Sequence, residues 1–596
     1  MSVMETAEAA ITRRLTIRER FTRLDRRGMF LVAFFVGALV YSQAEFWNQP
    51  SVGDRANWDY FAQVIARGGV PYRDVVNIKS PLSAYIGATA IVIARPFGMR
   101  DVLAIRITFL LLACLTLALT FLVALDYFNS PRVALFAAVI MLTFDAFARF
   151  NSGGIQPKTP MVLFGLLTLW AILKDRPFTA GVVGMLSALS WQPGLLFVGV
   201  AGLGFSRYFT SWRDMKVVRL IIGATIPLAV LLAYFWASGA LESFYRWSIH
   251  FNFTVYAPRQ SRKLEDFFTH LSRLMNGVYS RSREYFYVAL AGLVIAICRE
   301  TMGAIKKGAG YLVTSAPRHA VIIAPIIYSA FCMVNIQSGP DLIPLVPLVA
   351  IFAGVAFVFI IEQAIGLFQR FRSQKKPAHI EDWAIVAIVA LILYRSVGGA
   401  FSFDRGFPTL RDQQPAVEEI VSHLEPGDSI FVYGRSEVLV LSGMTNASKY
   451  FVLDRGKDEY LDRVEPGGFK GWLERLKAQR PKIIVVDRLD QTPYLNSFMQ
   501  WVTTEYAPRS NGFFYYYMRK DSTWWSATLR VVSEHRRMPT AVRRGVNLSA
   551  YKMLSIGWIR AASWPARSRS ITKDCNIRDC LTGRALLADA HSRQAW

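Results

Sequence analysis

The chain has 596 residues, of which 53% are hydrophobic and 19% are charged, and its mean hydropathy is +0.28. A soluble protein carries about a quarter charged residues, so this composition excludes an ordinary soluble enzyme and predicts a polytopic α-helical membrane protein. The net charge of +25 does not indicate nucleic-acid binding, because the Lys and Arg residues cluster between apolar runs. The five Cys residues have no spacing typical of a metal site or a disulfide framework.

The apolar runs predict about eleven membrane-spanning helices, since about 20 mostly apolar residues are needed to cross a bilayer. The first run, 29–47, follows a basic N-terminus at 1–28, which is expected to stay in the cytoplasm. Together, 29–397 form the expected membrane domain. The remaining spans are expected at 101–125, 131–149, 160–174, 178–192, 193–209, 217–238, 285–299, 320–336, 342–362 and 382–397.

Basic residues recur in every second loop, which predicts the sidedness of the chain. These loops lie near 174–176, 207–219, 299–318 and 370–376. Because cytoplasmic loops are enriched in Lys and Arg, the outer loop 47–100 and everything after 397 should face the periplasm of a bacterial inner membrane. The apolar run 80–97 would reverse this pattern if it crossed the bilayer. It is therefore predicted to be a juxtamembrane helix at the outer surface.

Residues 398–520 predict a small periplasmic α/β domain. Strands are expected over DSIFVYG, KYFVLD, PKIIVVD and FFYYYM, and helices over AVEEIVSHL and FKGWLERLKAQR. In the second helix, one face carries the apolar residues Phe469, Trp472, Leu473 and Leu476. This pattern predicts a domain that folds alone and serves as an acceptor platform or a lid. The basic tail, 521–596, is expected to be disordered or to contact anionic lipid.

The first outer loop carries the residues best suited to chemistry. It contains Asp54 and Asp59, then Tyr72-Arg73-Asp74, then Lys79 before Ser-Pro-Leu. A carboxylate at a membrane surface can deprotonate an acceptor hydroxyl, and a nearby Lys or Arg can hold a phosphate leaving group. Taken without further context, the same residues are also compatible with solvated loop acids and an interfacial anchor.

This stretch, GDRANWDYFAQVIARGGVPYRDVVNIKSPLSAYIGA, with the later Arg106, resembles the start of the GT-C superfamily of polyprenyl-phosphate-sugar-dependent glycosyltransferases. That superfamily includes protein O-mannosyltransferases and lipid A aminoarabinose transferases. The resemblance extends over roughly 29–520. It implies that Asp54 is the catalytic carboxylate and that Lys79, Arg106 and Arg73 contact the donor phosphate. Further candidate site residues are Asp59, Tyr72, Asp74 and Asp341.

The chain departs from the superfamily pattern at several positions. Arg55 follows Asp54 where many relatives have Glu, and Lys158 stands where some carry a second acid. Asp341 lies near a position where relatives often have His-Tyr. No cofactor is required by the implied chemistry, and Lys158 in place of an acid leaves a divalent metal requirement open. The sequence has no Asp-x-Asp pair and no phosphate-binding loop typical of ATPases.

The resulting hypothesis is an inverting transfer of a sugar from a polyprenyl-phosphate donor to an envelope glycolipid, polysaccharide or protein. Two alternatives remain: a non-catalytic transporter of lipid-linked glycans, and an assembly or scaffold protein of the envelope. A transporter needs polar residues inside its spans, and the predicted spans contain few. If 54–66 is helical, Asp54 and Asp59 project about 140° apart, so only one of them faces a cavity.

Overall fold

The structure is a computed structural model that describes residues 26–205, 215–260, 264–308, 311, 315–372, 380–400, 408–486 and 492–520. The tail expected at 521–596 and most of the basic N-terminus lie outside the described residues. The chain forms two compact units, one of Met1–Thr504 with Pro508–Met518 and one of Glu505–Ala507 with Arg519–Trp596. The membrane helices, the candidate site and nearly all of the α/β region belong to the first unit.

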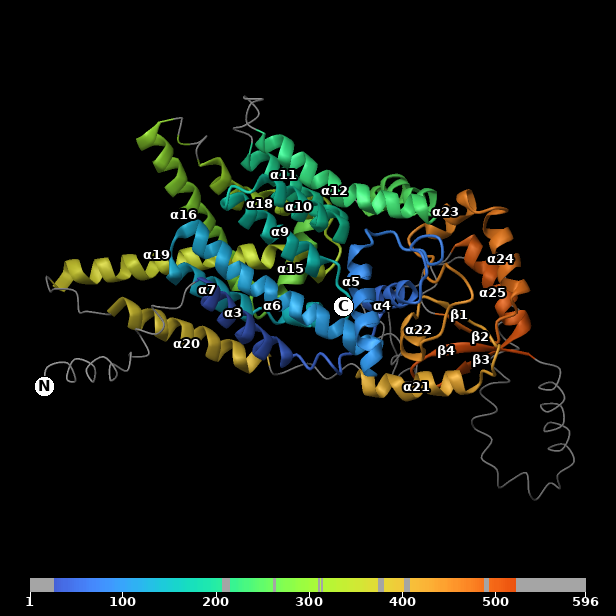
Figure 1. The fold of residues 1–596 in the computed structure, drawn as a ribbon. Helices are drawn as coiled ribbons and strands as arrows, with labels where there is room; N and C mark the ends of the chain where they lie inside the picture. Colours follow the sequence, from blue (N-terminus) through green and yellow to red (C-terminus); the bar gives the residue numbers. More distant parts are fainter. Residues whose placement is uncertain are drawn as a thin grey trace, which may run out of the picture. The chain divides into compact units, whose positions relative to one another are not determined.

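Each apolar run that predicts a span contains a helix in the structure (Figure 1). Within the described residues, five helices are long and apolar enough to cross a membrane, or six if α7 and α8, bent by 64°, form one broken span. Several others are shorter apolar helices, so the count of about eleven spans stays a prediction. In chain order the helices of this region are α3 (Arg26–Ser42), α6 (Asp101–Phe128), α7 (Pro131–Leu142), α8 (Asp145–Ser152), α9 (Lys158–Leu173), α10 (Pro177–Ser190), η2 (Gln192–Gly194), α11 (Leu195–Gly204), α12 (Lys216–Ala237), α16 (Arg283–Lys307), α18 (Ala316–Val334), η6 (Gly339–Leu345), α19 (Val346–Arg372) and α20 (Ile380–Ala400).

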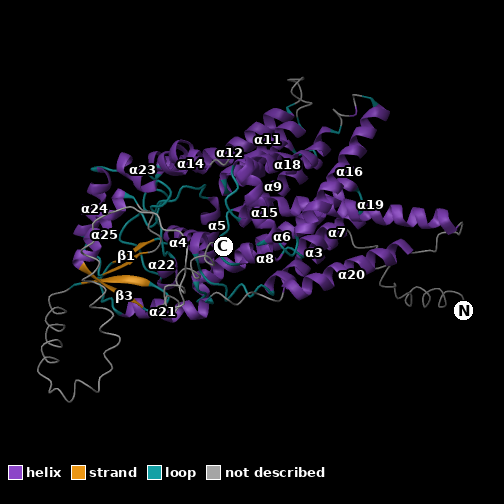
Figure 2. Cartoon of the chain, turned by 180° about the vertical axis from the view of Figure 1, so that it is seen from behind, coloured by secondary structure: helices purple, strands orange, loops and turns teal. Residues whose placement is uncertain are grey.

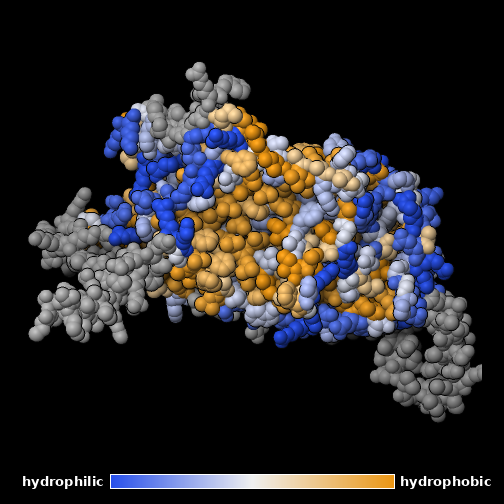
Figure 3. Space-filling view, viewed as in Figure 1, coloured by the Kyte–Doolittle hydropathy of each residue, from blue (hydrophilic) through white to orange (hydrophobic). Residues whose placement is uncertain are grey.

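The helical region exposes large apolar side chains on its outer surface. Phe35 and Leu39 on α3 are 65% and 67% exposed, and Val230 on α12 is 66% exposed. The space-filling view shows an apolar face with hydrophilic residues toward both ends (Figure 3). A soluble protein seldom leaves such a continuous apolar face in water, so this face is suited to lipid.

A second group of helices lies between the apolar helices in the sequence. It comprises α4 (Gly53–Ala66), α5 (Leu82–Ala94), η1 (Arg95–Phe97), α13 (Leu241–Phe244), η4 (Tyr245–His250), η5 (Asn252–Tyr256), α14 (Ala257–Gln260) and α15 (Leu264–Asn276). At about 1.5 Å per residue, α5 is about 20 Å long and cannot by itself cross a hydrocarbon core of about 30 Å. This length agrees with the predicted juxtamembrane helix at 80–97. The short helices η4 and η5 are π-helices, a rare form that is frequent at functional sites.

The α/β region has a four-stranded sheet in the order β1-β2-β4-β3, with β1 and β2 parallel and β2 and β4 antiparallel. Three predicted strands and both predicted helices are present. Its elements are α21 (Leu410–Ser422), β1 (Ile430–Tyr433), α22 (Glu437–Ser442), α23 (Lys457–Val464), α24 (Gly468–Ala478), β2 (Ile483–Val486), α25 (Pro493–Glu505), β3 (Tyr506–Ser510) and β4 (Tyr515–Arg519).

The strand predicted over KYFVLD is wrong, because side-chain hydrogen bonds occupy the edge of β1 beside it. The amide of Asn446 accepts from Val432 N at 2.7 Å and donates to Val432 O at 3.3 Å. Farther along, Gly434 N donates to Phe451 O at 2.7 Å, and no continuous ladder forms. The segment therefore continues as an irregular loop, which leads to the candidate site.

The alternation of side chains along β1 explains how the sheet is covered. Phe431 contacts Trp472 of α24 and Phe498 of α25, so one face of the strand packs on these two helices. Ile430 and Val432 point to the other face. There they join a buried cluster that includes residues of α4, α5 and α6, and Figure 2 shows β1 between α25 and α4.

This second cluster joins the α/β region to the first outer loop. Its members from α4 are Trp58, Tyr60, Phe61, Ala62 and Val64. Polar contacts reinforce the junction: Asn446 N donates to the Tyr60 hydroxyl at 2.9 Å, and Val76 N donates to Lys449 O at 3.0 Å. Because one face of the sheet is buried against α4, independent folding of 398–520, expected from its sequence pattern, is not supported.

Candidate active site

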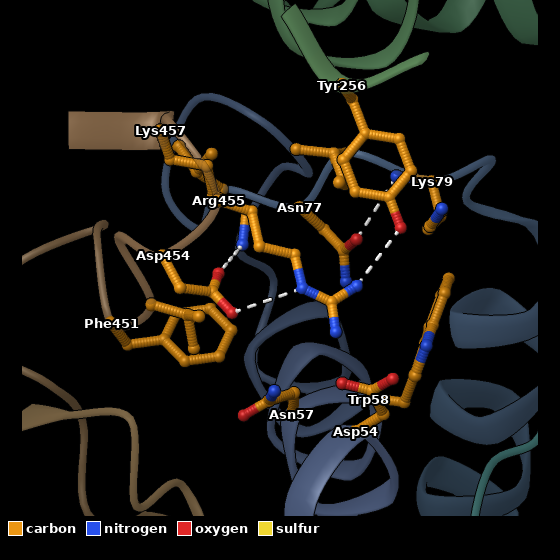
Figure 4. Close-up of a pocket in the computed structure, with 13 residues that line it drawn as sticks. Asp54, Asn57, Trp58, Asn77, Lys79, Tyr256, Phe451, Asp454, Arg455 and Lys457 are labelled. Atoms are coloured by element: carbon orange, nitrogen blue, oxygen red, sulfur yellow. Dashed lines mark hydrogen bonds and ion pairs between the residues drawn. The ribbon is translucent and has the colours of Figure 1, made fainter. Parts of the chain in front are cut away.

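One pocket collects residues from four separate parts of the chain (Figure 4). Helix α4, the loop before α5, the end of η5 and the irregular loop of the α/β region all contribute to it. Its lining residues are Asp54, Asn57, Trp58, Val76, Asn77, Ile78, Lys79, Tyr256, Phe451, Val452, Asp454, Arg455 and Lys457. The pocket therefore combines two carboxylates, three cations, amides and aromatic rings.

Asp54 lies in the first turn of α4, on the pocket side. A carboxylate in this position is stabilised by the helix dipole and by the unpaired N–H groups of the first turn. The side chain is exposed, and within the described residues it accepts no side-chain hydrogen bond or ion pair. Figure 4 shows the carboxylate facing the guanidinium of Arg455. Asp54 is thus accessible to a substrate and open to accept a proton.

Asp59 lies on the opposite side of the same helix and is completely buried. One carboxylate oxygen accepts a hydrogen bond from Ile155 N at 2.8 Å, and the other has no partner within the described residues. Burial raises the pKa of Asp59 to about 6, although the Ile155 N–H and the charges of Arg106 and Arg55 act in the opposite direction. As the helical geometry predicted, only Asp54 of this pair reaches the pocket.

The Lys79 ammonium and the Tyr256 ring lie together on one wall of the pocket. The Lys79 ammonium lies 4.3 Å from the centre of the Tyr256 ring, a cation–π contact. Burial raises the pKa of Tyr256, but the charges of Lys79 and Arg455 outweigh burial, and the net pKa is lowered. Tyr72 supports this wall from behind, because its hydroxyl donates to Lys79 O at 2.6 Å.

Arg455 reaches the pocket from the α/β region. Its Nη1 donates to Gln337 Oε1 at 3.1 Å and to the Tyr256 hydroxyl at 3.3 Å. Tyr256 in turn donates to Gln337 Oε1 at 2.9 Å. Burial lowers the pKa of Arg455, but Tyr256, Asp454 and Asp54 raise it above its ordinary value. The guanidinium is therefore held as a cation beside Asp54.

Two further cation candidates lie away from the pocket lining. Arg106 is completely buried in α6, and its Nη1 donates to Phe46 O at 2.9 Å, so its expected contact with the donor phosphate is not supported. Arg73 forms an ion pair with Asp74 at 2.9 Å and donates to Ser238 O at 2.8 Å. Arg73 and Asp74 thus satisfy each other rather than facing Asp54.

Asp341 forms a structural ion pair. It lies 3.0 Å from the Lys158 ammonium and accepts hydrogen bonds from Gln337 N and Ser338 N, both at 2.8 Å. Asp341 therefore fixes the backbone of the residue, Gln337, that holds Tyr256 and Arg455. Lys158 serves here as the counter-charge of Asp341.

No group of three or more His, Cys, Asp or Glu side chains within the described ranges is arranged to hold a metal ion.

The apolar helices, α4 and the α/β region form the fold that the resemblance to the GT-C superfamily predicted. The chain aligns with the crystal structure of ArnT from Cupriavidus metallidurans in the apo state, with a TM-score of 0.53 and 14% identity. The alignment covers 83% of this chain and 98% of that chain. No protein-family model and no curated protein sequence matches the chain.

Proposed function

We propose that the protein is an inverting glycosyltransferase that moves a sugar from a polyprenyl-phosphate donor to an acceptor hydroxyl at the outer face of a bacterial inner membrane. One observation carries the proposal: an exposed carboxylate, Asp54, faces two cations, Lys79 and Arg455, across a single pocket. The GT-C fold shared with ArnT supports a lipid-linked donor.

The chemistry follows from the charges. The acceptor oxygen attacks the anomeric carbon from the face opposite the phosphate, while Asp54 takes the hydroxyl proton. The bond between the anomeric carbon and the phosphate oxygen breaks, and its electron pair leaves with the lipid phosphate. Lys79 stabilises the charge that develops on that phosphate. Attack from the opposite face inverts the configuration at the anomeric carbon.

The acceptor is an envelope glycolipid, polysaccharide or protein. Asn57, Asn77 and the Trp58 ring lie beside Asp54 in the pocket. Amides and an aromatic face are the groups that bind sugar hydroxyls and stack on sugar rings. This composition supports an acceptor or donor sugar seated between Asp54 and Lys79.

The test is transfer from a polyprenyl-phosphate sugar by purified protein in detergent. Asp54→Asn keeps the side-chain volume but removes the proton acceptor, and we expect turnover to fall about 10²–10⁴-fold. Lys79→Ala should weaken use of the donor, since the phosphate loses a counter-charge. Asp266→Asn, an exposed acid in the first turn of α15 outside the pocket, is the matched control.

Thermal melting confirms that each variant is folded. A folded Asp54→Asn protein with turnover close to that of the wild type would reject the catalytic role. The transporter and scaffold alternatives would then account better for the pocket.

A further inference from the structure

The backbone at Arg455 is strained. Its φ is +56°, in the left-handed region that residues other than Gly, Asn and Asp seldom adopt, and Gly456 follows with φ +82°. Such a conformation costs free energy, so the surrounding structure must hold it. Strain of this kind gathers at binding and catalytic sites.

The turn is fixed on both sides of Arg455. Lys457 N donates to Asp454 O at 3.1 Å, and the Lys457 ammonium forms an ion pair with the Asp454 carboxylate. A Cβ atom at Gly456 would lie 2.1 Å from Nη1 of Arg259, so no larger residue fits there without movement. The Asp454-Arg455-Gly456-Lys457 turn is therefore built to present one side chain in one direction.

That direction is the pocket. Hydrogen bonds to Tyr256 and Gln337 hold the Arg455 guanidinium beside Asp54, and its side chain remains 48% exposed (Figure 4). Lys79 approaches the same Tyr256 from its ring face. Two cations thus flank one aromatic side chain, with the catalytic carboxylate candidate opposite them.

The charges of the pocket match a particular ligand. Asp454 forms ion pairs with both Lys457 and Arg455. Three cations of the pocket lining therefore stand against two carboxylates. The excess is one positive charge. A phosphodiester carries one negative charge, and a guanidinium binds two of its oxygens through a planar fork.

We infer that Arg455 is a donor-binding residue that contacts the phosphate together with Lys79, so that the α/β region supplies part of the active site. This inference rests on the proposed function and extends it to a residue far away in the sequence. The strained turn is the element that aims the guanidinium.

The strain supplies a sharp test, the variant Arg455→Gly. Glycine adopts a positive φ without penalty, so this variant removes the cation and relieves the backbone at the same time. We expect the Kd for undecaprenyl phosphate in detergent micelles to rise about 10- to 100-fold, as for loss of a charged hydrogen bond. Relief of the positive φ opposes the loss of the hydrogen bonds to Tyr256 and Gln337, so the melting temperature should stay close to that of the wild type.

Two further variants complete the experiment. Arg455→Lys keeps the charge without the planar fork, so its Kd should fall between those of the wild type and Arg455→Gly. Arg475→Ala removes an arginine that pairs with Glu465 outside the pocket, and it should leave the Kd unchanged.

The outcomes separate this inference from the proposed function. Unchanged lipid binding in Arg455→Gly, or weaker binding accompanied by a lower melting temperature, would overturn the donor-binding role. Asp54→Asn removes a negative charge from the pocket, so it should bind the lipid at least as tightly as the wild type and fail only in transfer. An inactive Asp54→Asn protein beside a normally binding Arg455→Gly protein would reject the inference alone, whereas an active Asp54→Asn protein would reject the proposed function.

Discussion

Asp59 permits a quantitative test of how α4 is placed. Its carboxylate is completely buried, with one oxygen hydrogen-bonded to Ile155 N and the other without a partner within the described residues. Substitution to Asn preserves the shape and the acceptor for Ile155 N. It removes the ability to ionise and places an amide NH2 group where the unpartnered oxygen stood.

The magnitude follows from the pKa of Asp59, which rises from 3.8 to about 6 on folding because the carboxylate is buried. The folded state therefore binds this proton more tightly than the unfolded state. Stability is greatest below pH 3.8 and is lost as the pH rises toward 6 and above. A difference of about two pKa units corresponds to about 3 kcal/mol, of which about 1 kcal/mol is lost between pH 5 and pH 7.5.

The assay compares the free energy of unfolding of wild type and Asp59→Asn in mixed micelles from pH 5 to pH 7.5. Other titrating groups are common to both proteins, so the wild-type value minus the variant value isolates Asp59. We expect this difference to fall by about 1 kcal/mol across the range. Relative to the wild type, the Asp59→Asn variant should be more stable at neutral pH than at pH 5. Its transfer activity should exceed that of Asp54→Asn.

A difference that stays flat with pH would refute this placement of Asp59. Asp54→Asn is the matched control, because it removes an exposed carboxylate from the same helix. A pH slope as large in the control as in Asp59→Asn would show that burial of Asp59 is not the cause.

Three other predictions concern the architecture. With Cys298, Cys575 and Cys580 replaced by Ala, a cysteine at Ile305 should resist a membrane-impermeant maleimide in spheroplasts, while one at Glu474 should react; the reverse labelling would refute the predicted sidedness. Gly154→Ala should lower the melting temperature, because φ is +141° and a Cβ would lie 2.9 Å from Asp59 Oδ2; an unchanged melting curve would contradict that crowding. Residues 408–520 expressed alone should show no cooperative thermal transition, because one face of β1 loses its cover from α4; a sharp melt would show a self-sufficient core.

The sequence was most informative where one segment determines its own structure. Alternating and helical apolar patterns predicted β1, β2, β4 and α24, and the predicted face of α24 is the buried one. The same local reasoning placed Asp54 and Asp59 on opposite sides of one helix. These predictions succeeded because the periods of helix and strand are local properties.

The remaining features depend on residues that are distant in the sequence. KYFVLD has the composition of a strand, but Asn446 occupies the edge that a strand would need. Arg106 is a cation at a suitable position in the motif, yet its partner is a backbone oxygen of the first loop. Arg455 carries no local signal of function, since its backbone conformation and its contact with Tyr256 appear only in three dimensions.

The core that α4 shares with the α/β region has a consequence for biosynthesis. Asp54 emerges early from the ribosome, whereas Arg455 and β1 follow about 400 positions later. At about 5–20 residues per second, the first outer loop waits roughly 20 to 80 s for its partner. During that interval the apolar side chains of α4 that later cover β1 are without their final neighbours. Chains that stop before the sheet is complete should therefore leave this apolar surface of α4 uncovered and be cleaved readily by proteases.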